Sequence, residues 1–117
     1  MTFEISIIKK DEALEISVAQ IYRARYTSTG SFKIQSPAFK ELTSFANSEG
    51  YPCEITPEEY APLILKFETE KSQLEESKQT SRGKDAHWNL ISLYDVVEGC
   101  YNGLRRAQEL GANLRIH

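Results

Sequence analysis

The side chains that most often carry catalysis or bind metals are scarce in this chain. It contains two histidines, His87 and His117, and two cysteines, Cys53 and Cys100. The cysteines are far apart and neither belongs to a Cys-x-x-Cys pair, so no zinc or redox motif is indicated. Isolated thiols are most often small core residues, with a disulfide as the alternative. We expect no metal site and no cofactor.

Short catalytic motifs are also missing from the sequence. The chain has no glycine-rich nucleotide loop, no His-Glu-x-x-His and no Gly-x-Ser-x-Gly. The pair His87-Trp88 is suited to a pocket mouth, because an imidazole and an indole can hydrogen-bond to a ligand and stack on it. The favoured interpretation is structural, with Trp88 anchoring a helix start in the core. A small enzyme or accessory subunit with a pocket at this pair is the alternative.

Acidic side chains are concentrated in one part of the chain. From Glu49 to Glu76 there are eight acids and two bases, a formal net charge of −6, whereas the rest of the chain carries +3. A surface of one charge sign speeds association with partners of the opposite sign. A solvated helix face that only aids solubility is the alternative, and paired catalytic carboxylates rank lower. The residues predicted to bind a basic protein partner are Glu54, Glu58, Glu59, Glu68 and Glu70.

Small residues recur every four positions near the C-terminus, at Gly99, Gly103 and Ala107. Glycine inside a helix costs about 1 kcal/mol relative to alanine, so two such glycines call for a compensating reason. Close approach of another backbone is the usual reason. We favour a tight crossing within the chain, against the helix that starts at Thr56 or against the sheet. A homodimer packed helix to helix is the alternative, so the chain is expected to be a monomer or a homodimer.

Composition indicates one ordinary globular domain over residues 1–117. Apolar residues make up 40% of the chain and charged residues 26%. The net charge of −3 argues against nucleic-acid binding. No segment approaches the roughly 20 apolar residues that span a membrane, and no secretory signal is visible. A cytoplasmic protein without membrane contact is expected.

The N-terminal third is predicted to hold two strands and a helix. Phe3, Ile5 and Ile7 alternate with polar residues, which predicts a strand over residues 2–9. Residues 11–25 fit both a helical period and the alternation of a strand. A helix is favoured there, and a hairpin with the first strand is the alternative. A short strand is predicted over residues 31–35.

Three helices are predicted in the rest of the chain. The first starts at Ser36-Pro37 and ends at Gly50. The second starts at Thr56-Pro57, and residues 71–85 are predicted to be its polar extension followed by a flexible loop. The third runs from near Asp85 to Leu110. Its apolar residues cover most of the circumference, so it is predicted to be buried on all sides. Gly111 would end it, and residues 114–116 would form an edge strand.

Together these patterns predict an α+β fold. The predicted domain is predominantly helical, with a small sheet of two to three strands, helices on one side of it and a long buried C-terminal helix. The predicted function is that of a small acidic protein-binding module. An inhibitor of the immunity or antitoxin type, bacterial or from a phage, that neutralises a basic partner such as a nuclease toxin would have this profile.

Overall fold

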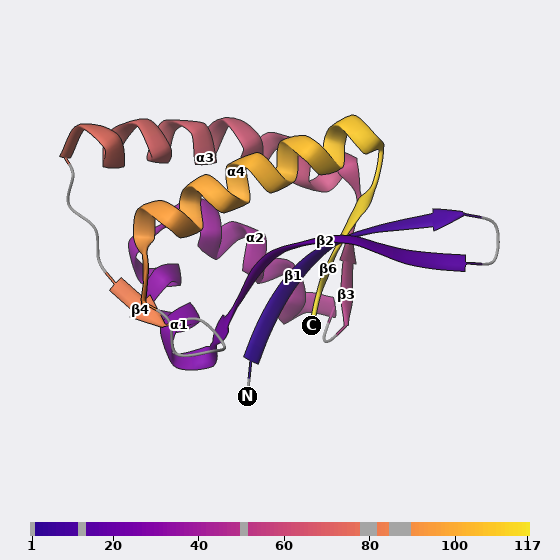
Figure 1. The fold of residues 1–117 in the computed structure, drawn as a ribbon, viewed down its shortest axis with the longest axis horizontal. Helices are drawn as coiled ribbons and strands as arrows, with labels where there is room; N and C mark the ends of the chain where they lie inside the picture. The colour runs from indigo at the N-terminus through magenta and orange to yellow at the C-terminus, as the bar shows by residue number, and fades with distance from the viewer. Residues whose placement is uncertain (1, 12–13, 50–51, 78–81, 85–89) are drawn as a thin grey trace.

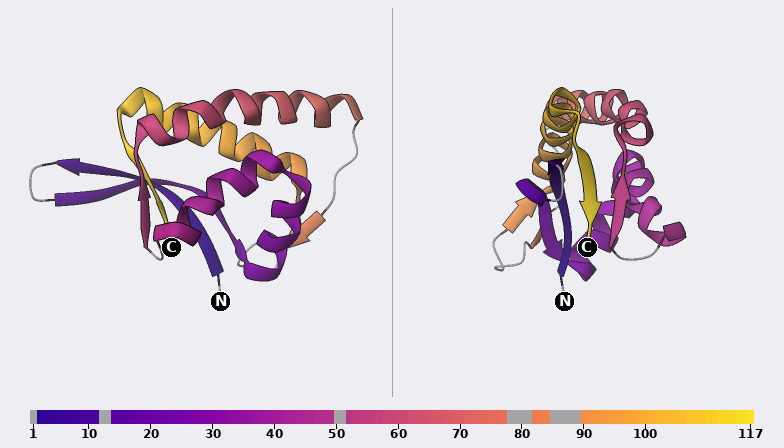
Figure 2. Two further views of the ribbon diagram at one scale, coloured as in Figure 1. Left: turned by 180° about the vertical axis from the view of Figure 1, so that it is seen from behind. Right: turned by 90° about the vertical axis from the view of Figure 1, so that its right-hand side faces the viewer.

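The computed structural model describes residues 2–11, 14–49, 52–77, 82–84 and 90–117. A four-stranded antiparallel sheet forms one layer, with the strand order β2-β1-β6-β3. The helices pack over one face of this sheet (Figure 1, Figure 2). The predicted α+β class is therefore confirmed, but the sheet has four strands instead of two to three. The strands are β1 (Thr2–Asp11), β2 (Leu14–Arg25), β3 (Cys53–Ile55) and β6 (Asn113–Ile116).

Four helices and a short second sheet complete the described fold. The second sheet pairs β4 (Arg82–Lys84) with β5 (Leu90–Ser92), so part of the segment predicted as a loop is a strand. Residues 78–81 and 85–89 lie outside the described residues. No described helix combines the length and apolarity needed to cross a membrane. The helices are α1 (Tyr26–Gln35), α2 (Pro37–Glu49), α3 (Pro57–Ser77) and α4 (Leu93–Leu110).

The helix predicted over residues 11–25 is wrong, because this segment is β2 and forms a hairpin with β1. Two irregularities in the pairing explain the error. Ile5 pairs with Tyr22 and Ser6 with Gln20, so Ile21 is an extra residue in β2. Val18 is a second extra residue in β2, because Ile7 pairs with Ala19 and Ile8 with Ser17. Each bulge inserts one residue, so positions that face the same side, such as Ala19 and Tyr22, are three residues apart instead of two, which is a helical spacing.

The strand predicted over residues 31–35 is also wrong, because these residues end α1. Phe32 is buried whereas Ile34 is 86% exposed, so the two side chains do not share one face of a strand. The Thr29 hydroxyl donates to the Arg25 carbonyl at 3.0 Å and shares a 2.8 Å hydrogen bond with the Tyr22 hydroxyl. These contacts fasten the first turn of α1 to the end of β2.

The predicted starts of α2 and α3 are confirmed. The Phe39 amide donates to the Ser36 hydroxyl at 3.1 Å, which is the contact of an N-cap. Pro62 lies inside α3, in its second turn. The predicted helical extension beyond residue 71 is present as far as Ser77. Gly50, the predicted end of α2, lies outside the described residues.

Helix α4 begins later than predicted and is not buried on all sides. Its N-cap is Ser92, which forms a reciprocal capping box with Asp95; Asp85 lies outside the described residues. The exposed side chains of α4 include Asp95, Asn102, Arg105 and Arg106. Gly111 ends the helix with φ of 62°, as predicted. The buried residues lie along one stripe: Leu93, Val96, Val97, Cys100, Leu104 and Ala107.

The last strand, β6, lies inside the sheet and not at its edge, because it pairs with β1 on one side and β3 on the other. Its alternation decides which face is covered: Leu114 and Ile116 are buried, and Arg115 points to the other face. The core therefore forms between the helices and one face of the sheet. The opposite face carries ion pairs, among them Arg23 with Glu4.

Candidate functional site

The acids predicted to bind a partner are spread over different parts of the fold. Glu54 lies in β3, on the outer face of the sheet. Its Oε1 accepts from Arg115 Nη2 at 2.8 Å, and its Oε2 accepts from Asn113 Nδ2 at 3.3 Å. Both donors belong to β6. The Glu54 carboxylate therefore fastens β3 to its neighbour and lies apart from the acids of α3.

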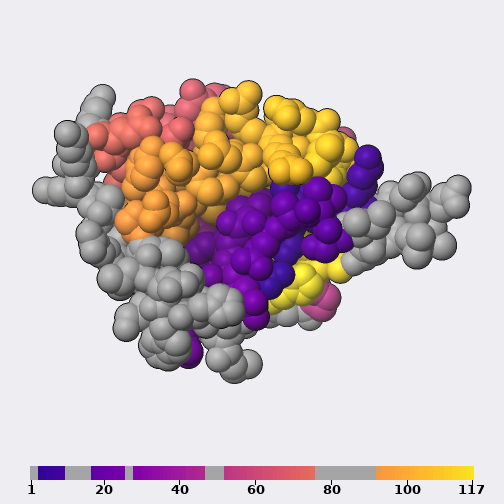
Figure 3. All heavy atoms as spheres, viewed as in Figure 1, coloured from indigo at the N-terminus to yellow at the C-terminus, as the bar shows by residue number. Residues whose placement is uncertain are grey.

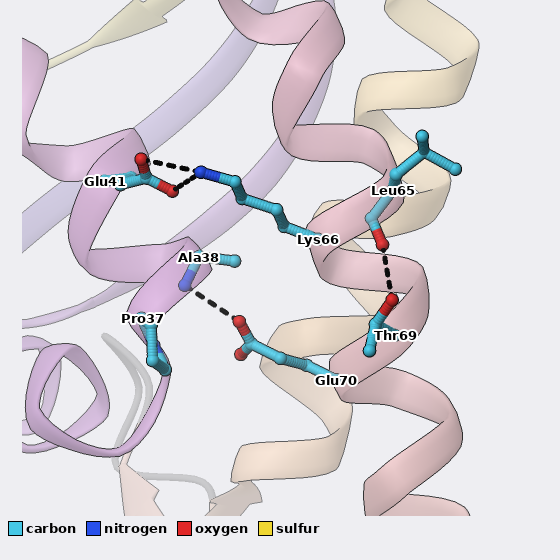
Figure 4. A pocket seen from close by; sticks show the side chains of 7 residues that line it. All are labelled: Pro37, Ala38, Glu41, Leu65, Lys66, Thr69 and Glu70. Atoms are coloured by element: carbon cyan, nitrogen blue, oxygen red, sulfur yellow. Dashed lines mark hydrogen bonds and ion pairs between the residues drawn. The ribbon is translucent and has the colours of Figure 1, made fainter.

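Two of the four α3 acids predicted to bind a partner have structural contacts. Glu59 Oε1 accepts from the Thr56 amide at 3.0 Å and from the Thr56 hydroxyl at 2.9 Å, which closes the start of α3. Glu70 reaches across to α2, where its Oε2 accepts from the Ala38 amide at 2.8 Å (Figure 4). Its Oε1 accepts from the buried Ser36 hydroxyl. Because the first amides of a helix lack partners, this carboxylate satisfies the N-terminus of α2.

Glu58 and Glu68 are exposed, and neither side chain makes a hydrogen bond or ion pair with another described residue. Glu68 is close enough to Arg105 of α4 to help raise the pKa of that guanidinium, after the larger effect of a hydrogen bond to Tyr101. Lys71 lies 5.3 Å from the centre of the Tyr101 ring. Bases are thus interleaved with acids where α3 and α4 meet.

The other candidate residues are placed as follows. His87 and Trp88 lie outside the described residues, so the predicted pocket is not placed. Gly99 and Gly103 face β2: a Cβ on Gly103 would lie 2.6 Å from Cγ1 of Ile21, and one on Gly99 would lie 3.7 Å from the Ile21 carbonyl oxygen. The small side chains of these residues therefore allow β2 of the same chain to pack closely against α4. The homodimer stays a prediction.

A groove between α2 and α3 was not predicted. It measures about 410 Å³ and lies open to solvent (Figure 4). Leu65 stands at its border with 70% of its surface exposed, whereas the core side chains of α3 face away from it. A large apolar residue outside the buried stripe of its helix is the sequence signal that indicates this site. The groove is lined by Pro37, Ala38, Glu41, Leu65, Lys66, Thr69 and Glu70.

Two polar ties hold the walls of the groove together. Lys66 Nζ lies 2.8 Å and 2.6 Å from the two carboxylate oxygens of Glu41, and both side chains are about half exposed. The second tie is Glu70 on the N-terminus of α2. Between the ties, Pro37 and Leu65 offer apolar surface, whereas Ala38 is buried in the core. The arrangement can accept an apolar side chain flanked by a polar or charged group.

The described titratable groups with shifted pKa values do not form a catalytic constellation. Burial raises the pKa of the Cys100 thiol, so this thiol is held neutral in the core. Hydrogen bonds to Glu75 and Glu98, both 2.7 Å long, raise the pKa of Tyr94. Within the described ranges, no three metal-ligating side chains converge. Cys53 and Cys100 are both buried, in agreement with the prediction of core thiols.

Comparison of this chain with protein-family models, with curated proteins and with solved structures yields no match.

Proposed function

We propose that this chain is a protein-binding module of the inhibitor or immunity type, and that the groove between α2 and α3 is its docking surface for a basic partner. The observation that carries the proposal is Leu65, an apolar side chain 70% exposed at the border of an open groove. Fully burying a leucine is worth about 1.5–3 kcal/mol. Most of that free energy is still available to a partner that covers Leu65.

Charge supports a basic partner. Helix α3 carries six acids and two lysines, a formal net charge of −4. One of the two, Lys66, is engaged with Glu41, and the other, Lys71, lies over Tyr101. Glu58 faces solvent on the same helix as Leu65. A basic partner would be attracted to α3 and would then bury its apolar surface in the groove.

The edges of the sheet favour the groove over recognition by strand addition. β3 is three residues long and lies between Pro52 and Pro57. β2 forms the other edge, next to α4 (Figure 3), and carries the bulges at Val18 and Ile21. Short strands, prolines and bulges all hinder the pairing of an added strand. The proposal places the module in the cytoplasm, where buried thiols such as that of Cys100 stay reduced.

The test is site-specific photo-crosslinking in lysate. A photoreactive amino acid replaces Leu65 in one variant and Leu110, an exposed leucine of α4 that does not line the groove, in a control. We expect one basic protein to crosslink at position 65 and not at position 110, with a yield that falls as salt is raised. Crosslinking that is equal at both positions, or that gives only acidic or heterogeneous products, would contradict the proposal.

A further inference from the structure

Four residues lie in one line along the outside of α3: Glu58, Pro62, Leu65 and Thr69. Their spacings of four, three and four place them on one face of the helix. All four are exposed. Seven residues separate Glu58 from Leu65, which corresponds to about 10 Å along the axis at the rise of an α-helix. The face therefore presents a free carboxylate two turns away from an apolar docking point.

The groove beside this line is open on one side. A small-molecule site usually encloses most of its ligand, whereas Leu65 keeps 70% of its surface in water. An open border along a helix is better matched by a second helix, which inserts apolar anchors and leaves its far side in solvent. The span from Leu65 to Glu58 also equals two turns of such a partner helix.

Charge identifies the residues that the partner helix presents. The groove is bordered by Glu41, Glu70 and Lys66, while the exposed base Lys40 does not line it. The pair of Lys66 with Glu41 is about half exposed, and exposed pairs of this kind contribute little to stability. A cation from a partner can therefore replace Lys66 at Glu41 at small cost. Glu58 and Glu41 therefore favour positive groups on the partner, whereas Glu70, at the other end of the groove, already binds the N-terminus of α2.

We infer that the groove recognises an amphipathic basic helix, which places an apolar side chain against Leu65 and Pro37 and a lysine or arginine seven positions away against Glu58. A second basic side chain takes the place of Lys66 at Glu41. This inference rests on the proposed function and specifies the form and the charge pattern of the partner segment.

The probe is a synthetic alanine-based helical peptide with one central leucine and one arginine seven positions from it. It is titrated into the isotope-labelled full-length chain, and amide shifts are followed by NMR. We expect shifts confined to residues 37–41 and 58–69. A peptide with glutamate in place of the arginine should bind about two- to fivefold more weakly, the range of an exposed ion pair.

Matched variants separate the two contacts. Leu65→Ser should weaken binding of the leucine–arginine peptide about tenfold, and Leu110→Ser should leave it unchanged. Glu58→Lys should remove the preference for arginine over glutamate, whereas the same reversal at the exposed Glu109 of α4 should keep it. Absence of groove shifts at millimolar peptide, or a preference for arginine that survives Glu58→Lys, overturns the inference.

The experiments fail in distinguishable ways. Lack of a specific crosslink at position 65 overturns the proposed function. A partner that does crosslink there, but whose affinity is the same for the wild-type chain and Glu58→Lys, leaves the function standing and overturns the helical, charge-matched mode of docking.

Discussion

Replacing Gly103 by alanine tests how closely α4 crosses the sheet. A Cβ at this position would lie 2.6 Å from Cγ1, 2.7 Å from Cδ1 and 3.0 Å from Cγ2 of Ile21. Carbon atoms in ordinary contact are about 3.5–4.0 Å apart. Ile21 is branched at Cβ and its χ1 is stiff, so Cγ1 and Cγ2 cannot withdraw without moving β2. Alanine at position 103 therefore overpacks this crossing.

The magnitude follows from two opposing effects. Overpacking a buried contact costs about 1–3 kcal/mol. Alanine in place of glycine inside a helix stabilises the folded state by about 1 kcal/mol. Gly103→Ala should therefore lower the free energy of unfolding by about 0–2 kcal/mol. In Gly99→Ala, one turn earlier, the new Cβ would lie at an ordinary 3.7 Å from the Ile21 carbonyl oxygen. This variant should raise the free energy of unfolding by up to about 1 kcal/mol.

The assay is urea unfolding of both variants, of Ile21→Ala and of the double variant Gly103→Ala/Ile21→Ala. Because Ile21→Ala deletes all three crowded carbon atoms, Gly103→Ala should become stabilising by about 1 kcal/mol in that background. The difference between the two backgrounds measures the crowding directly. Equal effects of alanine at 99 and 103, or an unchanged effect of Gly103→Ala when Ile21 is truncated, would refute the close crossing.

The other two predictions concern the contact of Glu70 with the N-terminus of α2 and the buried hydroxyl of Tyr60. Glu70→Ala should destabilise the chain by about 1–3 kcal/mol in urea unfolding, because it removes the acceptor of the Ala38 amide and the Ser36 hydroxyl. The control Glu68→Ala, at an exposed position, should change stability by less than about 0.5 kcal/mol. Equal effects of the two variants would contradict a structural role of the Glu70 contacts with α2. Burial raises the pKa of Tyr60 to about 12 from the ordinary 10.0, so between pH 10 and 12 the unfolded chain releases this proton and the folded chain keeps it. The stability that this group contributes below pH 10 is lost as the pH rises from 10 to 12, by up to about 1.4 kcal/mol per pH unit. In urea unfolding between pH 10 and 12, Tyr60→Phe should show a pH dependence shallower by that amount. An unchanged slope would contradict a buried, protonated Tyr60.

The Tyr60→Phe variant should also be less stable at neutral pH. The Tyr60 hydroxyl donates to the Ala112 carbonyl at 2.8 Å, and phenylalanine leaves that buried acceptor without this donor. The loss at pH 7 and the shallower alkaline slope are separate readouts of one contact. They distinguish removal of a titrating group from general weakening, which would lower stability equally at every pH.

The sequence predicted the elements whose signals are local. The starts of α2 and α3 were found because a serine or threonine followed by proline satisfies helix-start geometry within four residues. The end of α4 was found because Gly111 adopts a left-handed conformation that few other residues accept. The strand β1 was recognised from its alternation, since one of its faces lies on the core. None of these predictions required knowledge of a distant segment.

The sequence did not predict the elements whose signals depend on partners. β2 is a strand because β1 pairs with it, and its bulges hide the alternation that would identify it. β3 is three residues long and exists because β6 lies beside it. Residues 31–35 are helical because Phe32 must reach the core while the turn before it is tied to β2. In each case a pairing or packing partner outside the segment decided its structure.

The candidate site shows the same division. Composition alone identified the region that forms α3 as acidic. Only the tertiary structure showed that Glu54 and Glu70 are engaged in structural contacts and that Leu65 borders a groove against α2. The reason is that a side chain's type and helical phase are fixed locally, whereas its neighbours are set by packing of segments distant in sequence. The sequence by itself therefore determined which side chains α3 offers, and the packing of α3 against α2 and α4 decided which of them remain available to a partner.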